Sequence, residues 1–146
     1  MGAVLGGAPE EDCKRIYRYA VELGLAFQLQ DDLLDCYGDQ KTLGKRIGGD
    51  IVEGKKTFLT VMAMSVADER RRRLLREAYD DKTQTEEQKI ERVKGIYDML
   101  DIRHIAEQQI SSRFDRALSM LSMLSAPQAD TSVLDAFARS LVGRKK

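Results

Sequence analysis

Residues 27–35 read Phe-Gln-Leu-Gln-Asp-Asp-Leu-Leu-Asp, and this acidic segment decides how the rest of the chain is interpreted. On a helix, Asp31 and Asp35 lie one turn apart on the same face, with Asp32 beside them. Like charges this close repel one another, so their grouping favours a bound cation. Carboxylate oxygens suit Mg²⁺, which uses one or two protein carboxylates together with phosphate oxygens and water. The alternative for the acidic motif alone is a solvated acidic patch.

The segment from Gly38 to Gly54 follows directly and holds five of the chain's 11 glycines. Lysines and an arginine lie among these glycines and just after them: Lys41, Lys45, Arg46, Lys55 and Lys56. So many glycines predict a loop with unusual backbone angles and little helix. Backbone amides in such a loop can approach an anion, and lysines supply point charges for phosphate. The alternative is a flexible, charged surface loop.

Composition limits the classes of protein that this chain can belong to. The 146 residues suit one domain, 1–146, and 24 basic residues against 24 acidic ones give no net charge that would indicate nucleic acid or a membrane surface. The only cysteines, Cys13 and Cys36, lack metal-type spacing and are interpreted as reduced thiols. No apolar run approaches the roughly 20 residues of a membrane span, and residues 1–8 lack the features of a signal peptide. We therefore expect a cytoplasmic protein without a membrane span.

The hydrophobic pattern has a helical period along the chain, and no segment alternates as a strand does. Residues 1–8 are either the frayed end of a helix or a turn. Beyond them the pattern predicts helices from Pro9 to about Cys36, from Thr57 to near Asp68, from Glu69 to Tyr79, from Thr85 to Leu100, from Ile102 to Leu124, and from Asp130 or Thr131 to Leu141. Thr85 and Gln88 form a capping-box pattern. The predicted fold class is all-α.

The first long helix has two distinct faces. Its predicted buried face is a stripe of apolar residues: Ile16, Ala20, Leu23, Phe27 and Leu34. The second stripe is small or polar throughout: Gly24, Gln28, Asp31 and Asp35. We expect this second face to be turned towards something charged.

The segment from Gly24 to Thr57 resembles the second aspartate-rich region of the trans-isoprenyl diphosphate synthases, the polyprenyl synthetase family. The resemblance rests on the ordered set FQxxDDxxD, GKxxGGD and GKKT, and this order argues against a terpene cyclase relative. It implies the C-terminal part of the isoprenoid synthase helical bundle. It also implies Mg²⁺ as cofactor, and an allylic diphosphate and isopentenyl diphosphate as substrates.

The resemblance also assigns roles to single residues. Metal ligands would be Asp31, Asp32 and Asp35, with Asp31 the most direct. The lysines that hold the allylic diphosphate during catalysis would be Lys45 and Lys55. Other substrate-binding positions would be Phe27 and Gln28 in the reaction cleft, Asp50 orienting the lysine-bearing loop, and Arg144 over the second diphosphate.

The implied reaction is a head-to-tail condensation of isopentenyl diphosphate with the allylic diphosphate. Breaking the carbon–oxygen bond of the allylic substrate leaves a carbocation and a pyrophosphate with extra negative charge, which Mg²⁺ and lysines stabilise. No histidine base is needed, because the departing pyrophosphate can remove the proton. The only histidine, His104, is interpreted as structural.

The chain departs from the family in length and in lacking a first aspartate-rich motif. We therefore expect the C-terminal half only, as a shortened chain, a proteolytic product or the product of a split gene. Such a half would be inactive or nearly so alone, and its uncovered apolar surface predicts a homo-oligomer, such as a dimer. The alternative function is a noncatalytic helical subunit or remnant that binds Mg²⁺-diphosphate.

Overall fold

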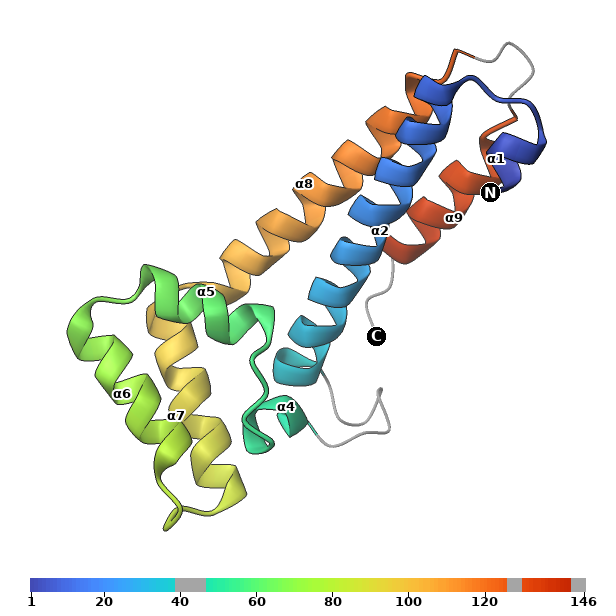
Figure 1. Ribbon diagram of the computed structural model, residues 1–146. Coiled ribbons are helices and arrows are strands. Elements are labelled where there is room, and N and C mark those ends of the chain that lie inside the picture. Colours follow the sequence, from blue (N-terminus) through green and yellow to red (C-terminus); the bar gives the residue numbers. More distant parts are fainter. Residues whose placement is uncertain (39–46, 126–129, 143–146) are drawn as a thin grey trace. The chain divides into compact units, whose positions relative to one another are not determined.

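The computed structural model describes residues 1–38, 47–125 and 130–142, and every regular element among them is a helix (Figure 1). The helices are α1 (Gly2–Leu5), α2 (Glu10–Tyr37), α4 (Gly49–Val52), α5 (Phe58–Val66), α6 (Glu69–Asp80), α7 (Glu86–Met99), α8 (Ile102–Ser122) and α9 (Ser132–Val142). The all-α prediction is confirmed. Within these residues, no helix combines the length and the apolar character that crossing a membrane requires.

The chain forms two compact units. We call Met1–Gln28 with Gln109–Lys145 the terminal unit, and Leu29–Gln108 the central unit. Two long helices, α2 and α8, contribute residues to both units. The three aspartates of the acidic segment and the second half of the glycine-rich segment belong to the central unit.

The central unit is built around α5, α6 and α7, with α6 and α7 packed side by side (Figure 1). Its buried core draws on these helices, the end of α2, α4 and the start of α8: Cys36, Ile51, Leu59, Ala63, Leu75, Ala78, Val93, Ile96, Tyr97, Ile102 and Ala106. Three hydroxyls close a triangle within this unit. Thr60 Oγ1 lies 3.1 Å from Tyr79 Oη and 2.9 Å from Tyr97 Oη, and the two phenol oxygens are 2.9 Å apart. The triangle joins α5, α6 and α7 and satisfies hydroxyls whose burial would otherwise be costly.

The terminal unit packs α2 against α8 and α9. Its buried core contains Tyr19, Leu23, Ala26, Phe114, Ala117, Leu121 and Ala138. The Tyr19 hydroxyl donates to the Leu134 carbonyl at 2.8 Å. Asp12, only 1% exposed, accepts hydrogen bonds from the Ser125 N–H and hydroxyl and pairs with Arg15. These contacts fix α2 to α9 and the start of α2 to the segment that follows α8.

Helix boundaries follow the local sequence signals closely. The Thr85–Gln88 capping box is confirmed, with both of its hydrogen bonds present at the start of α7. Thr57 caps α5 and Asp68 caps α6 through their side-chain oxygens. Asp101, the one described residue other than glycine with a positive φ (54°), separates α7 from α8.

The prediction of little helix and unusual backbone angles between Gly38 and Gly54 lies in part outside the described residues, which lack 39–46. Within the described part, α4 is only four residues long, and Gly48 and Gly54 have left-handed φ values on either side of it. One expectation from the sequence needs correction. The predicted buried stripe of α2 is wrong at Ala20, which is exposed. The neighbouring Tyr19 is buried in its place, and its hydroxyl has a partner in the Leu134 carbonyl.

Candidate functional site

The three aspartates near the end of α2 occupy different environments. Asp31 is exposed, Asp35 is half-buried, and Asp32 is only 8% exposed. Their carboxylates are therefore chemically alike but not equally available to a ligand from solution.

Asp32 is tied to the start of α5. One of its carboxylate oxygens accepts the Phe58 N–H at 3.0 Å, and Phe58 is the first residue of that helix. The first N–H groups of a helix lack partners within the helix, and a carboxylate is a favourable acceptor for them. Asp32 therefore joins the acidic helix to the residues that follow Lys55 and Lys56.

Asp35 is tied to the start of α4 by two hydrogen bonds. Its carboxylate accepts the Asp50 N–H at 3.0 Å, and its backbone carbonyl accepts the Gly48 N–H at 2.7 Å. Partial burial raises the pKa of the Asp35 carboxyl, and the Asp50 N–H partly offsets this effect. A nearby cation would favour the ionised form of this carboxyl.

Gly48 allows this close approach of α4 to the rest of the unit. Its φ is +81°, and a Cβ atom added there would lie 2.8 Å from the Ile90 side chain. A side chain at this position would meet both backbone strain and a steric clash. The glycine at position 48 is thus explained by backbone geometry and by packing against α7.

Lys55 follows α4 and is held through both its backbone and its side chain. Its N–H donates to the Asp50 carbonyl at 2.9 Å, and its ammonium pairs with the Asp50 carboxylate at 2.6 Å and with Glu53 at 3.1 Å. Hydrogen bonds to Asp50 and Glu53 raise the pKa of Lys55. The side chain stays 55% exposed, so the cation is fixed in position yet open to an anion from solution.

The donor set fits a hard cation that brings most of its own ligands. Among residues 1–38, 47–125 and 130–142, no three His, Cys, Asp or Glu side chains are grouped so that they could together hold a metal ion. Mg²⁺ does not need such a group, because it is commonly bound through one or two carboxylates plus phosphate oxygens and water. Asp31 is the most exposed of the three carboxylates.

Two of the remaining predicted site residues belong to the terminal unit. Phe27, half-buried, and Gln28, exposed, precede Asp31 on α2 and belong to the terminal unit. Lys45 and Arg144 lie outside the described residues. His104 is exposed on α8, with a ring nitrogen 2.9 Å from Gln108 Nε2.

Glu53 and Lys89 contact this region although the sequence did not indicate them. Glu53 pairs with Lys55, and Lys89 donates to the Val52 carbonyl at 3.2 Å. The short spacing from Glu53 to Lys55 could have suggested their pair. Nothing local marks Lys89, which comes from a different helix.

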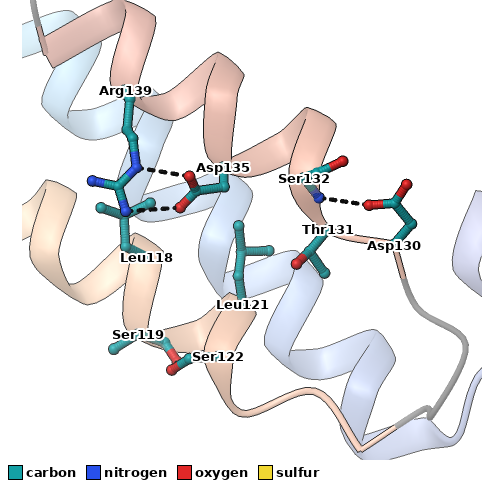
Figure 2. Close-up of a pocket in the computed structure, with 9 residues that line it drawn as sticks. All are labelled: Leu118, Ser119, Leu121, Ser122, Asp130, Thr131, Ser132, Asp135 and Arg139. Carbon is teal, nitrogen blue, oxygen red and sulfur yellow. Dashed lines mark hydrogen bonds and ion pairs between the residues drawn. The ribbon is translucent and has the colours of Figure 1, made fainter.

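An open groove in the terminal unit, of about 680 Å³, lies between α8 and α9 (Figure 2). Figure 2 shows the Arg139 guanidinium turned towards the Asp135 carboxylate, with N–O distances of 2.7 and 3.1 Å. Asp130, at the start of α9, accepts the Ser132 N–H at 2.9 Å. None of the described residues that were predicted to bind metal or substrate lines this groove, so we take the aspartates of the central unit and Lys55 as the candidate site.

Comparison with known proteins places these residues in context. The family model for polyprenyl synthetase matches residues 1–97. A curated short chain isoprenyl diphosphate synthase from Methanocaldococcus jannaschii is 43% identical over 88 residues, which are 60% of this chain and 27% of that protein.

Solved structures agree with this match. The crystal structure of a geranylgeranyl pyrophosphate synthase superposes with a TM-score of 0.82 at 36% identity, covering 99% of this chain and 45% of that one. A polyprenyl synthase from Caulobacter crescentus, solved with calcium and isoprenyl diphosphate, gives a TM-score of 0.78 at 30% identity and covers 99% and 44%. The chain spans less than half the length of each of these three proteins.

Proposed function

Because this chain belongs to the polyprenyl synthetase family, we propose that it contributes the second aspartate-rich half of a trans-prenyltransferase site. The reaction is the Mg²⁺-dependent, head-to-tail condensation of isopentenyl diphosphate with an allylic diphosphate. The observation that carries the proposal is the connection of Asp35 to Asp50 and of Asp50 to Lys55. It places an exposed ammonium on the segment that is anchored directly to the acidic helix.

Each residue has a separate task in this proposal. Asp31 would hold Mg²⁺, with Asp32 and Asp35 adding oxygens to the ion or to its waters. When bound, the ion would neutralise negative charge on the diphosphate oxygens. Lys55, and Lys45 from outside the described residues, would add positive charge where the pyrophosphate leaves, while Asp50 keeps Lys55 in place. Phe27, Gln28 and Arg144 would contact the rest of the substrates.

One relative supports the pairing of a divalent cation with a diphosphate. The Caulobacter crescentus polyprenyl synthase was crystallised with calcium and isoprenyl diphosphate. Calcium and magnesium both bind oxygen ligands, so the carboxylates near the end of α2 suit either ion.

Turnover tests the proposal directly. The purified chain is mixed with Mg²⁺, labelled isopentenyl diphosphate and a set of short allylic diphosphates. One series also contains the part of a full-length synthase that this chain does not match. We expect chain-extended product in the mixture and little from the chain alone. Product should be lost in Asp31→Ala and retained in the control Asp115→Ala, an exposed aspartate on α8. Product that survives Asp31→Ala would contradict the assignment of the site.

The alternative function is a noncatalytic helical subunit or remnant that binds Mg²⁺-diphosphate. It would use the same carboxylates near the end of α2 and the exposed Lys55 ammonium. Pyrophosphate binding without product in any mixture would select the subunit over the enzyme.

We also propose that the chain is cytoplasmic and associates with a second copy. Three large apolar side chains on α2 are exposed: Tyr17 (70%), Val21 (40%) and Leu25 (44%). They follow one another at spacings of four residues and so lie along one face of the helix. Light scattering after size exclusion should give a dimer for the chain and a monomer for Leu25→Asp. A monomeric wild-type chain would contradict this part of the proposal.

A further inference from the structure

We propose that Lys89 is a positioning residue for diphosphate binding. It holds the carboxyl end of α4 while Asp35 holds the amino end. This inference rests on the proposed function of Lys55 as a diphosphate ligand. It concerns a residue of α7 that lies outside the motifs on which the resemblance is based.

The amino end of α4 is fixed by Asp35. The two hydrogen bonds from the Gly48 and Asp50 N–H groups, at 2.7 and 3.0 Å, orient the first turn of this four-residue helix. So short a helix has almost no stability of its own, and outside contacts must hold it. One such contact fixes only one end.

The carboxyl end is fixed by Lys89. Its ammonium donates to the Val52 carbonyl at 3.2 Å, and Val52 is the last residue of α4. Carbonyls at the end of a helix lack partners within the helix, and a charged donor satisfies them well. The same ammonium lies 5.4 Å from the centre of the Tyr79 ring, a cation–π contact.

Tyr79 is itself held in place, so Lys89 rests on a fixed support. Its hydroxyl belongs to the triangle with Thr60 and Tyr97. The Thr60 hydroxyl also donates a hydrogen bond to the Lys55 carbonyl at 3.4 Å. The backbone of Lys55 is thus held by this contact on one side and by α4 on the other.

Lys55 depends on α4 because its N–H donates to the Asp50 carbonyl and its ammonium contacts the Asp50 carboxylate. If the carboxyl end of α4 were released, Lys55 would sample more positions. Ordering it upon ligand binding would then cost conformational entropy. Because Lys89 and Asp35 hold α4 at both ends, ligand binding does not have to order Lys55.

The test measures binding of inorganic pyrophosphate in the presence of Mg²⁺ by titration calorimetry. Lys89→Met keeps most of the side-chain stem and removes the donor, and Lys89→Arg restores a cation. Lys94→Met is the matched control: Lys94 is also on α7 and also lies over a tyrosine ring, 5.2 Å from the centre of Tyr37. Losing one hydrogen bond predicts a dissociation constant roughly 3- to 10-fold higher for Lys89→Met. Lys89→Arg should recover at least half of the loss, and Lys94→Met should stay within about 2-fold of wild type.

Hydrogen exchange gives a second readout that needs no ligand. The Glu53 and Gly54 N–H groups donate to the Gly49 and Ile51 carbonyls. They should exchange faster in Lys89→Met than in the wild-type chain, and at the wild-type rate in Lys94→Met. Equal weakening of pyrophosphate binding in both variants would overturn the proposal, because charge alone would explain it. Unchanged exchange in Lys89→Met would overturn it as well. If the wild-type chain binds no pyrophosphate, the proposed function fails, and exchange alone then decides whether Lys89 holds α4.

Discussion

Gly48 is the residue at which the route of the chain into α4 is most constrained. Its positive φ and its contact with Ile90 are independent reasons for glycine. Gly48→Ala should therefore lower the free energy of unfolding by about 3 kcal/mol, the sum of backbone strain and overpacking. Chemical denaturation measures this loss.

Gly54 is the matched control for that substitution. Its φ is also positive, at +67°, but no atom lies within 4 Å of an added Cβ. Gly54→Ala should cost only about 1 kcal/mol from backbone strain. Equal losses of unfolding free energy in the two variants would show that the contact with Ile90 does not contribute.

In the proposed site, Glu53 would compete with a diphosphate for the Lys55 ammonium. Its carboxylate lies 3.1 Å from Lys55 Nζ, and both side chains are well exposed. Glu53→Gln should tighten Mg²⁺-pyrophosphate binding by up to about 5-fold, since an exposed ion pair is worth at most about 1 kcal/mol. Calorimetric titration measures the change, with exposed Glu91→Gln as the control. Weaker binding by Glu53→Gln would mean that Glu53 helps to position Lys55 more than it competes.

At the scale of the element, the start of α5 depends on Asp32. Replacing it with alanine would leave the Phe58 N–H without this acceptor in a part-buried place. In buffer free of Mg²⁺, Asp32→Ala should lower the free energy of unfolding by about 1 to 3 kcal/mol. Asp31→Ala should cost less, no more than about 1 kcal/mol, because Asp31 is exposed and exposed ion pairs contribute little.

Thermal and chemical unfolding of these two variants distinguish structural from ligand-binding aspartates. A stability loss for Asp31→Ala as large as that for Asp32→Ala would contradict the division of roles. Pyrophosphate binding should separate the two variants as well. Asp31→Ala should weaken binding while the chain stays fully folded, whereas Asp32→Ala should weaken binding mainly by destabilising the fold.

For the whole molecule, buried tyrosines predict how stability depends on pH. Burial raises the pKa of Tyr79 and of Tyr97, whereas Tyr17 is 70% exposed. The unfolded chain ionises these phenols at their ordinary pKa of about 10. The stability that comes from keeping them neutral is fully present below that pH and is lost as pH rises through their higher folded-state pKa values.

Tyrosinate absorbance and denaturant unfolding at increasing pH check this expectation. Tyr97→Phe should flatten the decline of stability above pH of about 10, and Tyr17→Phe should leave it unchanged. The same slope in both variants would contradict the role of burial.

Much of the fold could be predicted from the sequence because its signals are local. The cap at Thr85 with Gln88 and the charged first turn of α2 depend on residues within one or two turns. The acidic segment and the GKKT sequence identified the family for the same reason.

The rest depends on contacts between distant residues. Asp31 and Asp32 are adjacent and chemically identical, yet only the packing of α5 decides which of them is buried. The helix α4 forms in a glycine-rich segment because Asp35 and Lys89 hold its two ends. Lys89 comes from α7, and no periodicity or spacing could have indicated it.

We propose above that the acidic end of α2 and Lys55 together bind a diphosphate through Mg²⁺. The most direct measurement is calorimetric titration of inorganic pyrophosphate into the wild-type chain and Asp31→Asn, with and without Mg²⁺. We predict binding to the wild-type chain only when Mg²⁺ is present. We also predict a dissociation constant at least about 10-fold higher for Asp31→Asn at an unchanged melting temperature. Binding that is independent of Mg²⁺, or equal in the two proteins, would contradict it.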